Sequence, residues 1–336
     1  MFGAMIGVRA PEFIGNENDW INTHPLRMSD LRGKIVLIDF WDYTCINCIR
    51  TLPYLREWHN RYKDKGLVIV GIHTPEFEFA KDRENVEEAV EKFGIDYPVL
   101  LDPDYENWQA YANRYWPRKY IVDADGKIVY DHAGEGAYGD TENVIQQLLK
   151  EINPDVELPQ LMEPVTGEGK PGAVCYPVTP ELYAGYRRGI IGSPEGYKQG
   201  EVVEYTDPGE HEDGVIYARG PFYIADEYLR HAKQTEYPKD YIAIRYHAIE
   251  VNAVMRPAKG EFDVLVTQDG KPIDLLDAGT DVYLADGNTW VTVDEPRMYR
   301  IVKNREFGSH ELRLASNSDS FTLYAFTFGS CEQAQP

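Results

Sequence analysis

The sequence predicts two domains of different fold class, an α/β domain with a central mixed sheet flanked by helices, followed by an all-β sandwich of jelly-roll type. Up to about residue 150, patterns of buried strands alternate with helical patterns, whereas beyond residue 172 apolar residues recur mostly with a period of two. A chain of 336 residues is also long enough to form two hydrophobic cores of ordinary size.

The α/β pattern begins with two apolar runs typical of buried strands, at 35–41 and 67–73, and a helix is expected between them at 52–62. Further helices are expected at 84–93, 106–114 and 140–150, and further strands at 97–101, 119–122 and 127–130. The sequence Asp-Ala-Asp-Gly at 123–126 is typical of a turn between antiparallel strands. The sheet is therefore expected to contain both parallel and antiparallel pairs.

A linker is predicted at 153–172, where prolines and glycines are concentrated without periodicity. The first domain is accordingly placed at 1–152 and the second at 173–336. Strands of the second domain are expected where apolar and polar residues alternate, at 241–246, 262–266, 289–293 and 320–328. Turn sequences such as Asp286-Gly287 separate these stretches, which favours a sandwich.

The charge and the N-terminal sequence limit the partners and the location. A formal net charge of −22 argues against nucleic acid and anionic membranes as partners. Residues 1–8 are weakly apolar, but no basic residue precedes them and they are too short for the core of a signal peptide; no stretch is long enough for a membrane helix. The chain is then either cytoplasmic or the soluble part of an exported or membrane-anchored protein. Its cysteines favour the second alternative.

Cys45 and Cys48 form a Cys-x-x-Cys motif between the predicted strand 35–41 and the helix that follows. Such a motif is either a redox pair or half of a zinc site. Zinc requires about four ligands, and Cys175 and Cys331 lie far apart without a second motif. The histidines of the second domain also lack ligand-like spacing: His211, His231, His247 and His310. We therefore expect a redox pair, and neither a metal nor a cofactor.

The position of the motif assigns different roles to its two cysteines. At the start of a helix, unpaired backbone N–H groups and the helix dipole stabilise a thiolate. Cys45 is expected to be the exposed attacking thiolate, and Cys48 the resolving thiol that closes the intramolecular disulfide and releases the substrate. Pro53 lies within the helical pattern and is expected to kink the helix.

Two further residues suit thiol chemistry. Asp39 interrupts an apolar strand six residues before Cys45, and burial would raise its pKa so that it could accept or return the proton of Cys48. The alternative is an acid at a strand edge, or one paired with a lysine. Pro117 directly precedes a strand expected beside 35–41. Because most X-Pro bonds are trans, the residues alone leave a plain loop proline open.

Several of these motifs together resemble thioredoxin, and more closely its TlpA/ResA-like extracytoplasmic branch. They are Asp39-Phe40-Trp41, Cys45-x-x-Cys48, Pro53, Pro117 and Asp125-Gly126-Lys127-Ile128. With the β-rich region from Thr179 to Gly329, the arrangement is similar to the soluble C-terminal part of DipZ proteins. In that family a thioredoxin-like domain precedes a β-sandwich resembling a carbohydrate-binding module, often after a CcdA-type membrane domain that delivers electrons.

The resemblance implies a thioredoxin fold and an extracytoplasmic enzyme, a thiol-disulfide oxidoreductase that acts on protein thiols and disulfides. It implies a CcdA/DsbD-like membrane protein as electron donor, and a sandwich that recruits a protein partner, the donor or a glycan. Its reaction centre would consist of Cys45 and Cys48 with a buried Asp39 and a substrate-facing cis-Pro117. Supporting residues are Trp41, Thr44, Ile46, Asn47, Trp116 and Glu76.

The motif departs from thioredoxin at the residues around its cysteines. Thr44 stands where thioredoxins usually have tryptophan, and Ile46-Asn47 replaces their Gly-Pro, which leaves the direction of electron flow open. Glu76 is similar to the additional active-site acid of the ResA-like branch, although a solvated loop acid is the alternative.

Cys175 and Cys331 open and close the second domain, a placement that suits a disulfide between its ends. The alternative is two unrelated buried thiols. The many tyrosines of this domain, which include Tyr183, Tyr186, Tyr197, Tyr205, Tyr217, Tyr223 and Tyr228, are expected to fill the core, although exposed aromatic rings can stack on sugars.

Two other functional classes remain as alternatives. The chain would be a glycan-binding or adhesion module if the first domain were only a scaffold, but the intact pair of Cys45 and Cys48 argues against this. A thiol peroxidase would require Pro-x-x-x-Thr-x-x-Cys around its reactive cysteine, and the sequence before Cys45 does not match that pattern.

Overall fold

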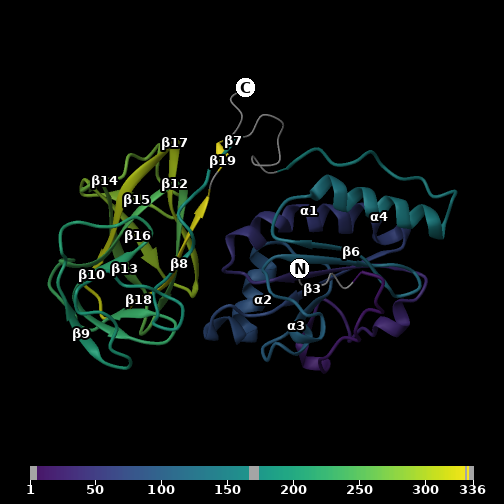
Figure 1. Ribbon diagram of the computed structural model, residues 1–336, viewed down its shortest axis with the longest axis horizontal. Helices are drawn as coiled ribbons and strands as arrows, with labels where there is room; N and C mark the ends of the chain where they lie inside the picture. The colour runs from purple at the N-terminus through teal and green to yellow at the C-terminus, as the bar shows by residue number, and fades with distance from the viewer. Residues whose placement is uncertain (1–5, 166–173, 330, 333–336) are drawn as a thin grey trace. The chain divides into compact units, whose positions relative to one another are not determined.

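A computed structural model describes residues 6–165, 174–329 and 331–332 of the chain. Figure 1 shows two compact units, Met1–Lys170 and Pro171–Pro336. Of the linker expected at 153–172, residues 166–172 lie outside the described part, and residues 153–165 form no helix or strand. Within the described residues, no helix combines the length and the apolar composition needed to cross a membrane.

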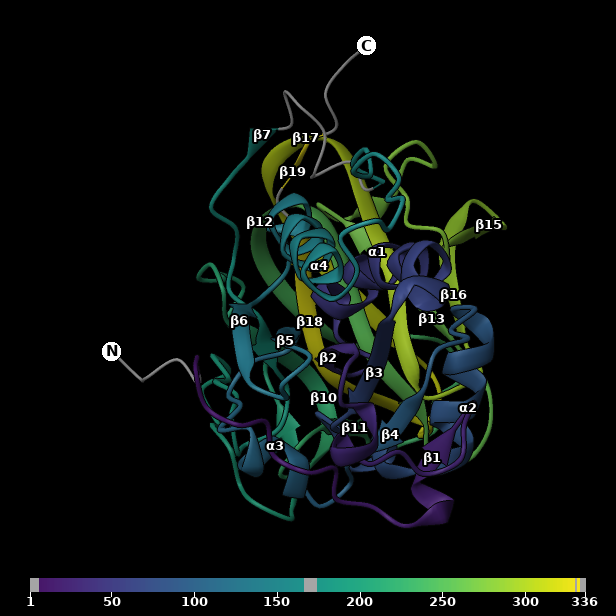
Figure 2. The same ribbon diagram turned by 90° about the vertical axis from the view of Figure 1, so that its right-hand side faces the viewer.

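The first unit contains a six-stranded mixed sheet in the order β1-β4-β3-β2-β5-β6, which Figure 2 shows from one edge to the other. Its strands are β1 (Trp20–Ile21), β2 (Ile35–Trp41), β3 (Leu67–His73), β4 (Val99–Leu101), β5 (Arg118–Val122) and β6 (Ile128–Ala133). Strands β2, β3 and β4 are parallel to one another, and the remaining pairs are antiparallel. The predicted mixed α/β fold class is confirmed.

The helices of this unit are α1 (Ile46–Tyr62), α2 (Arg83–Lys92), α3 (Glu106–Ala110) and α4 (Tyr138–Ile152), with short 3-10 turns at Glu17–Asp19, Met28–Leu31, Lys63–Lys65 and Glu78–Lys81. Helices α1 and α4 lie together on one side of the sheet (Figures 1 and 2), where Tyr54 stacks on Tyr138 with ring centroids 3.5 Å apart. Helix α3 is shorter than the predicted 106–114. Its last carbonyls are capped by Tyr111, and Ala112 has a positive φ of 48° that ends the helix.

Strand β2 places the functional residues because it is central and both of its faces are covered. All seven of its residues are buried. Val36, Ile38 and Phe40 point into an apolar core on one face, and the alternation of a strand directs Asp39 and Trp41 to the opposite face. The chain leaves β2 at Trp41 and enters α1 at Ile46, so the Cys-x-x-Cys motif lies at the junction of strand and helix.

The second unit is built from antiparallel strands, and the described residues form no helix in it, so the predicted all-β class is confirmed. Its strands are β7 (Val174–Cys175), β8 (Leu182–Tyr183), β9 (Val202–Tyr205), β10 (Ile216–Ile224), β11 (Leu229–His231), β12 (Asp240–Pro257), β13 (Phe262–Gln268), β14 (Lys271–Pro272), β15 (Tyr283–Ala285), β16 (Asn288–Val293), β17 (Arg297–Ser316), β18 (Phe321–Gly329) and β19 (Cys331–Glu332).

Two long strands, β12 and β17, connect the parts of the sandwich. The first half of β12 lies between β10 and β17, whereas its second half lies between β17 and β18. The register of β12 against β17 shifts between Ala248 and Glu250 and again between Val251 and Asn252, as expected where bulges bend a strand. The inward side chains form one continuous apolar core.

The tyrosines singled out in the sequence divide into two groups. Tyr205 and Tyr217 are buried, as predicted. The other five keep part of their surface exposed: Tyr183, Tyr186, Tyr197, Tyr223 and Tyr228. Of these, Tyr186 and Tyr197 pack against the core. For these five, the prediction of a core position was only partly right.

Candidate active site

The Cys45 and Cys48 side chains lie at the first turn of α1, and both are thiols in this structure. Cys45 is the N-cap residue, and its Sγ accepts a hydrogen bond from the backbone N–H of Cys48 at 3.2 Å. The expectation that Cys45 is exposed was wrong, since only 8% of its surface is accessible while Cys48 is fully buried. The cause is this cap, because the side chain folds back over the first turn and does not extend into solvent.

The environments of the two thiols suit different roles. Burial raises the pKa of Cys48 well above its ordinary value, and its hydrogen bond with Cys45 raises it further. Cys45 lies where the helix N-terminus presents unpaired N–H groups, which stabilise a thiolate. Cys45 can therefore attack a disulfide while Cys48 still holds its proton.

Asp39 and Lys119 lie opposite each other in the antiparallel pairing of β2 with β5, and both are fully buried. Neither carboxylate oxygen of Asp39 has a hydrogen-bond partner. Burial raises the pKa of Asp39 to about 7, and the positive charge of Lys119 opposes this rise. A strand-edge position for Asp39 is excluded because β2 is central. A carboxyl with a pKa near neutrality can both accept and return a proton.

Lys119 is a charged side chain that the sequence analysis did not select as a site residue. Burial lowers its pKa, and the negative charges of Asp39 and Cys48 act in the opposite direction. Its Nζ donates a hydrogen bond to the carbonyl oxygen of Gly134 at 3.3 Å and lies 5.6 Å from the ring centroid of Tyr138. The sequence signal that could have identified it is a lysine inside the predicted strand 119–122. The residue that this lysine faces, however, depends on the register between β5 and β2.

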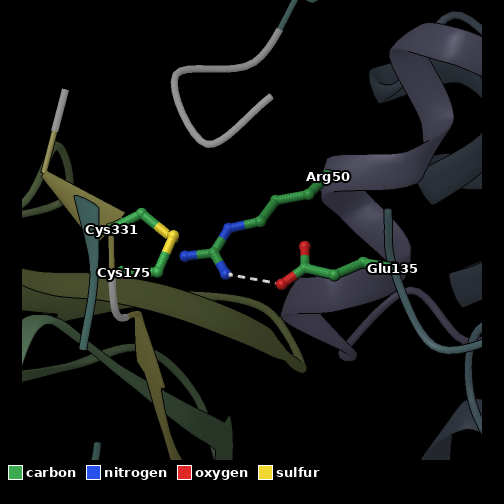
Figure 3. Close-up of a disulfide and its surroundings, with 4 residues drawn as sticks. All are labelled: Arg50, Glu135, Cys175 and Cys331. Atoms are coloured by element: carbon green, nitrogen blue, oxygen red, sulfur yellow. Dashed lines mark ion pairs between the residues drawn. A yellow bond between two sulfur atoms is a disulfide. The ribbon is translucent and has the colours of Figure 1, made fainter. Parts of the chain in front are cut away.

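An ion pair lies near this lysine in the first unit. Figure 3 shows that the guanidinium of Arg50, from α1, points toward the carboxylate of Glu135, with the atoms 3.5 Å apart. The charge of Glu135 also raises the pKa of Lys119. Helix α1 therefore carries a positive charge next to the cysteine motif, in the segment that follows Cys48.

Trp116 and Pro117 lie directly before β5, and the peptide bond between them is cis. Trp116 donates from Nε1 to the carbonyl oxygen of Thr74 at 2.9 Å and packs on Trp108 with ring centroids 4.2 Å apart. Pro117 is buried, and its carbonyl oxygen accepts the N–H of Gly134 at 2.8 Å. The bond to Thr74 holds the segment before β5 against the segment after β3.

The remaining supporting residues surround the motif. Trp41 is fully buried at the end of β2, and its ring meets that of His73 edge to face at 5.1 Å. Ile46 is the buried first residue of α1. Asn47 is half-buried, and its carbonyl oxygen accepts the hydroxyl of Thr51 at 2.9 Å.

Glu76 is buried, with 7% of its surface accessible, so the interpretation of a solvated loop acid was wrong. It follows β3, and its backbone N–H donates to Oδ2 of Asp42 at 2.9 Å, which draws the segment inward. Thr44 is also buried and is bonded to Asp42 through both its N–H and its hydroxyl. Asp42 is thus a second buried carboxyl beside the cysteines, in addition to Asp39. The sequence analysis did not select it.

Cys175 and Cys331 form a disulfide, shown in Figure 3, with Cα atoms 4.0 Å apart. They belong to β7 and β19, which pair as a two-stranded ribbon with these two residues opposite each other. Within the described parts of the chain, no three His, Cys, Asp or Glu side chains are grouped in a way that could hold a metal ion. The histidines of the second unit pair with carboxylates instead, as in His211 with Asp207 and His231 with Asp240.

Comparison with known proteins gives relatives for both units. A family described as "Thioredoxin like C-terminal domain" matches residues 179–329, and the AhpC/TSA family matches residues 6–131. Protein DipZ of Mycobacterium tuberculosis is 34% identical over 92% of this chain and 41% of its own length. The thiol-disulfide oxidoreductase ResA of Bacillus thuringiensis is 30% identical over 44% of this chain and 79% of its own length.

Among solved structures, a thioredoxin-like protein in the oxidized form is 28% identical with a TM-score of 0.40, covering 44% of this chain and 99% of that chain. The present chain spans about two fifths of the length of the DipZ proteins that it matches, 41%.

Proposed function

This chain belongs to the family of the thiol-disulfide oxidoreductase ResA, and on that premise we propose that it exchanges disulfides with protein substrates through Cys45 and Cys48. One observation carries the proposal. Cys45 caps α1 with Cys48 in the turn that follows, while Asp39, whose charge acts on Cys48, has its pKa raised to about 7.

In the reducing direction, the Cys45 thiolate attacks one sulfur of a substrate disulfide. A mixed disulfide forms, and the other substrate sulfur leaves as a thiolate. Cys48 then loses its proton to Asp39 and attacks the sulfur of Cys45. This second step releases, as a thiolate, the substrate sulfur that was bound to Cys45, and it leaves a Cys45–Cys48 disulfide. Two electrons have then passed to the substrate. The same steps in reverse oxidise a substrate dithiol.

Asp39 acts in this scheme as the proton acceptor for Cys48. A pKa of about 7 matches the proton exchange to neutral pH, where both protonation states of the carboxyl are populated. Lys119 stabilises the carboxylate form of Asp39, because its positive charge lowers the pKa that burial has raised. We assign contact with the substrate chain to the segment of Trp116, which is half-buried, and Pro117, which is buried.

We assign the protein an extracytoplasmic location, with a CcdA/DsbD-like membrane protein as its electron donor. The disulfide between Cys175 and Cys331 supports the location, because such bonds persist in oxidising compartments. The similarity to DipZ over 92% of this chain supports the donor. The β-sandwich would recruit this donor, a protein substrate or a glycan, and its partly exposed tyrosines offer rings that can stack on a sugar.

The test is the equilibrium reduction potential of the Cys45–Cys48 couple, measured in glutathione or dithiothreitol buffers together with turnover of a protein disulfide. A potential near about −270 mV would identify a reductase, and one near about −120 mV an oxidant. A Cys45→Ser variant that kept full activity toward a disulfide substrate would overturn the assignment.

A further inference from the structure

Asp42 lies one residue after β2, between Trp41 and Tyr43, and its side chain is fully buried. A buried carboxyl is unfavourable unless hydrogen-bond donors satisfy it. Here Oδ1 accepts the N–H of Thr44 at 2.6 Å and also the Thr44 hydroxyl, while Oδ2 accepts the N–H of Glu76 at 2.9 Å. Both oxygens are thus bonded, and they join two segments that are far apart in the sequence.

The main chain of Asp42 is bonded to the cysteine pair as well. Its carbonyl oxygen accepts the N–H of Cys45 at 3.3 Å. A hydrogen bond from its main chain also reaches Cys48 and favours the thiolate form of that residue, which lowers its pKa. One residue therefore contacts both cysteines through its backbone, and through its side chain it holds Thr44, the residue directly before Cys45.

The segment that Asp42 binds also contacts the residue before Pro117. The N–H of Thr74 donates to the carbonyl oxygen of Trp41 at 3.1 Å, and the carbonyl oxygen of Thr74 accepts Nε1 of Trp116 at 2.9 Å. The run 74–76 thus connects the residue before Cys45 with the residue before Pro117.

We propose that Asp42 is a positioning residue for the exchange reaction, which fixes Cys45 at the N-terminus of α1 by tying Thr44 to the backbone of Glu76. The proposal rests on the function proposed above, since it assigns the geometry of the same reactive pair. Asp42 contacts neither substrate nor the reacting sulfur through its carboxylate. It acts through Thr44, whose position decides whether Sγ of Cys45 can accept the N–H of Cys48.

His73 is a titratable group that faces this carboxylate. Its Nε2 lies 3.6 Å from Oδ2 of Asp42, and burial lowers the pKa of His73 to about 3, so the ring is neutral at pH 7. The ring also stacks on Tyr43 with centroids 5.5 Å apart. The hydrogen bonds to this carboxyl therefore come from neutral donors, Thr44 and the backbone of Glu76.

The test is a double-mutant cycle with Asp42→Asn and Thr44→Val, read as the rate of alkylation of Cys45 by iodoacetamide across pH. Thr44→Val removes the hydroxyl bond and leaves the carboxyl group of Asp42, whose pKa burial raises. Asp42→Asn replaces one carboxylate oxygen by an NH2 group, which cannot accept the N–H of Glu76. We expect each single variant to slow alkylation about fivefold at neutral pH, the factor that one ordinary hydrogen bond represents. The pH at which alkylation of Cys45 reaches half of its maximal rate is expected to be higher in Thr44→Val than in the unmodified protein.

Both substitutions break the same link between Thr44 and Glu76. The double variant should therefore be alkylated no more slowly than the slower of the two single variants. Thr44→Ser, which keeps the hydroxyl, should behave like the unmodified protein. The proposal is overturned if Thr44→Val matches Thr44→Ser, or if the effects of Asp42→Asn and Thr44→Val multiply.

Glu142→Gln is the matched control for a general loss of stability. Glu142, in α4, is also a buried carboxyl. It accepts the hydroxyl of Tyr62, the last residue of α1, at 2.6 Å and the N–H of Met162 at 2.8 Å. Its variant should lower the urea midpoint without changing the alkylation of Cys45. A similar change of alkylation in Glu142→Gln would contradict the proposal.

Alkylation needs no substrate or turnover, so the two proposals can fail separately. An unmodified protein that cannot reduce or oxidise a protein disulfide would contradict the proposed function. The alkylation rates would still decide whether Asp42 positions Cys45.

Discussion

Asp39 and Lys119 face each other across the antiparallel pairing of β2 and β5, and neither side chain is exposed to solvent. The two groups shift each other's pKa in opposite directions, since the charge of Lys119 lowers that of Asp39 and the charge of Asp39 raises that of Lys119. Lys119 also interacts with the charge of Cys48, which connects the pair to the reactive motif. The consequences can be measured both in stability and in the rate of exchange.

Asp39→Asn should stabilise the protein at pH 8 and much less at pH 5. The pKa of Asp39 is raised from 3.8 to about 7, so between these values the folded state keeps a proton that the unfolded state has lost. The free energy of unfolding therefore falls as pH rises, and the full cost of burying the ionised Asp39 carboxylate is present above pH 7. The gain in the free energy of unfolding at pH 8 is at most about 4 kcal/mol. Urea unfolding at both pH values measures it, and a variant less stable than the unmodified protein at pH 8 would contradict the assignment.

Lys119→Met should move the pH dependence of mixed-disulfide resolution to higher pH. Without the lysine charge, the pKa of Asp39 rises further, and the carboxylate that accepts the proton of Cys48 becomes scarcer at neutral pH. Asp39→Asn should instead abolish this pH dependence and slow the step by about 100-fold. Stopped-flow kinetics of the second step measure both variants. Lys127→Met, at an exposed lysine in the same hairpin, should leave the profile unchanged.

Cys48→Ser should trap a covalent complex with a protein disulfide substrate. Cys45 still attacks, but the thiol that would attack the mixed disulfide is missing, so the complex accumulates. Non-reducing gel electrophoresis and mass spectrometry detect it. Cys45→Ser is the matched control and should form no complex. If Cys45→Ser traps substrate and Cys48→Ser does not, the two roles are reversed.

Replacing both Cys175 and Cys331 by alanine should destabilise the second unit without changing the exchange reaction. The disulfide closes a loop with a sequence separation of 156, for which chain entropy gives an upper limit of about 5 kcal/mol. Denaturant unfolding monitored by near-ultraviolet circular dichroism measures the loss. Unchanged stability would show that the ribbon of β7 and β19 holds without its covalent bond.

The local features of the site could be predicted from sequence because they depend on neighbours along the chain. The apolar run before Cys45 predicted a buried strand, and a single acid within it predicted a buried carboxyl with a raised pKa, as found for Asp39. The placement of Cys175 and Cys331 at the two ends of one domain likewise suggested the bond that joins them.

Some predictions failed where a side chain turns toward a partner that is distant in sequence or folds back on its own helix. Glu76 looks like a loop acid, but its backbone is bonded to Asp42, 34 residues earlier, and is drawn into the interior. Cys45 was expected in solvent, yet its sulfur turns inward to cap α1. Neither contact has a sequence pattern of its own.

The sequence by itself determined the two fold classes, the Cys-x-x-Cys motif at the entry to a helix and the acid in the strand before it. Only the tertiary structure decided that Lys119 faces Asp39 and that Asp42 links Thr44 to Glu76. The physical reason is that periodicity records which face of an element is buried, whereas these contacts depend on the register of β5 against β2 and on the path of the chain after β3. Register and path are set by the packing of the whole sheet.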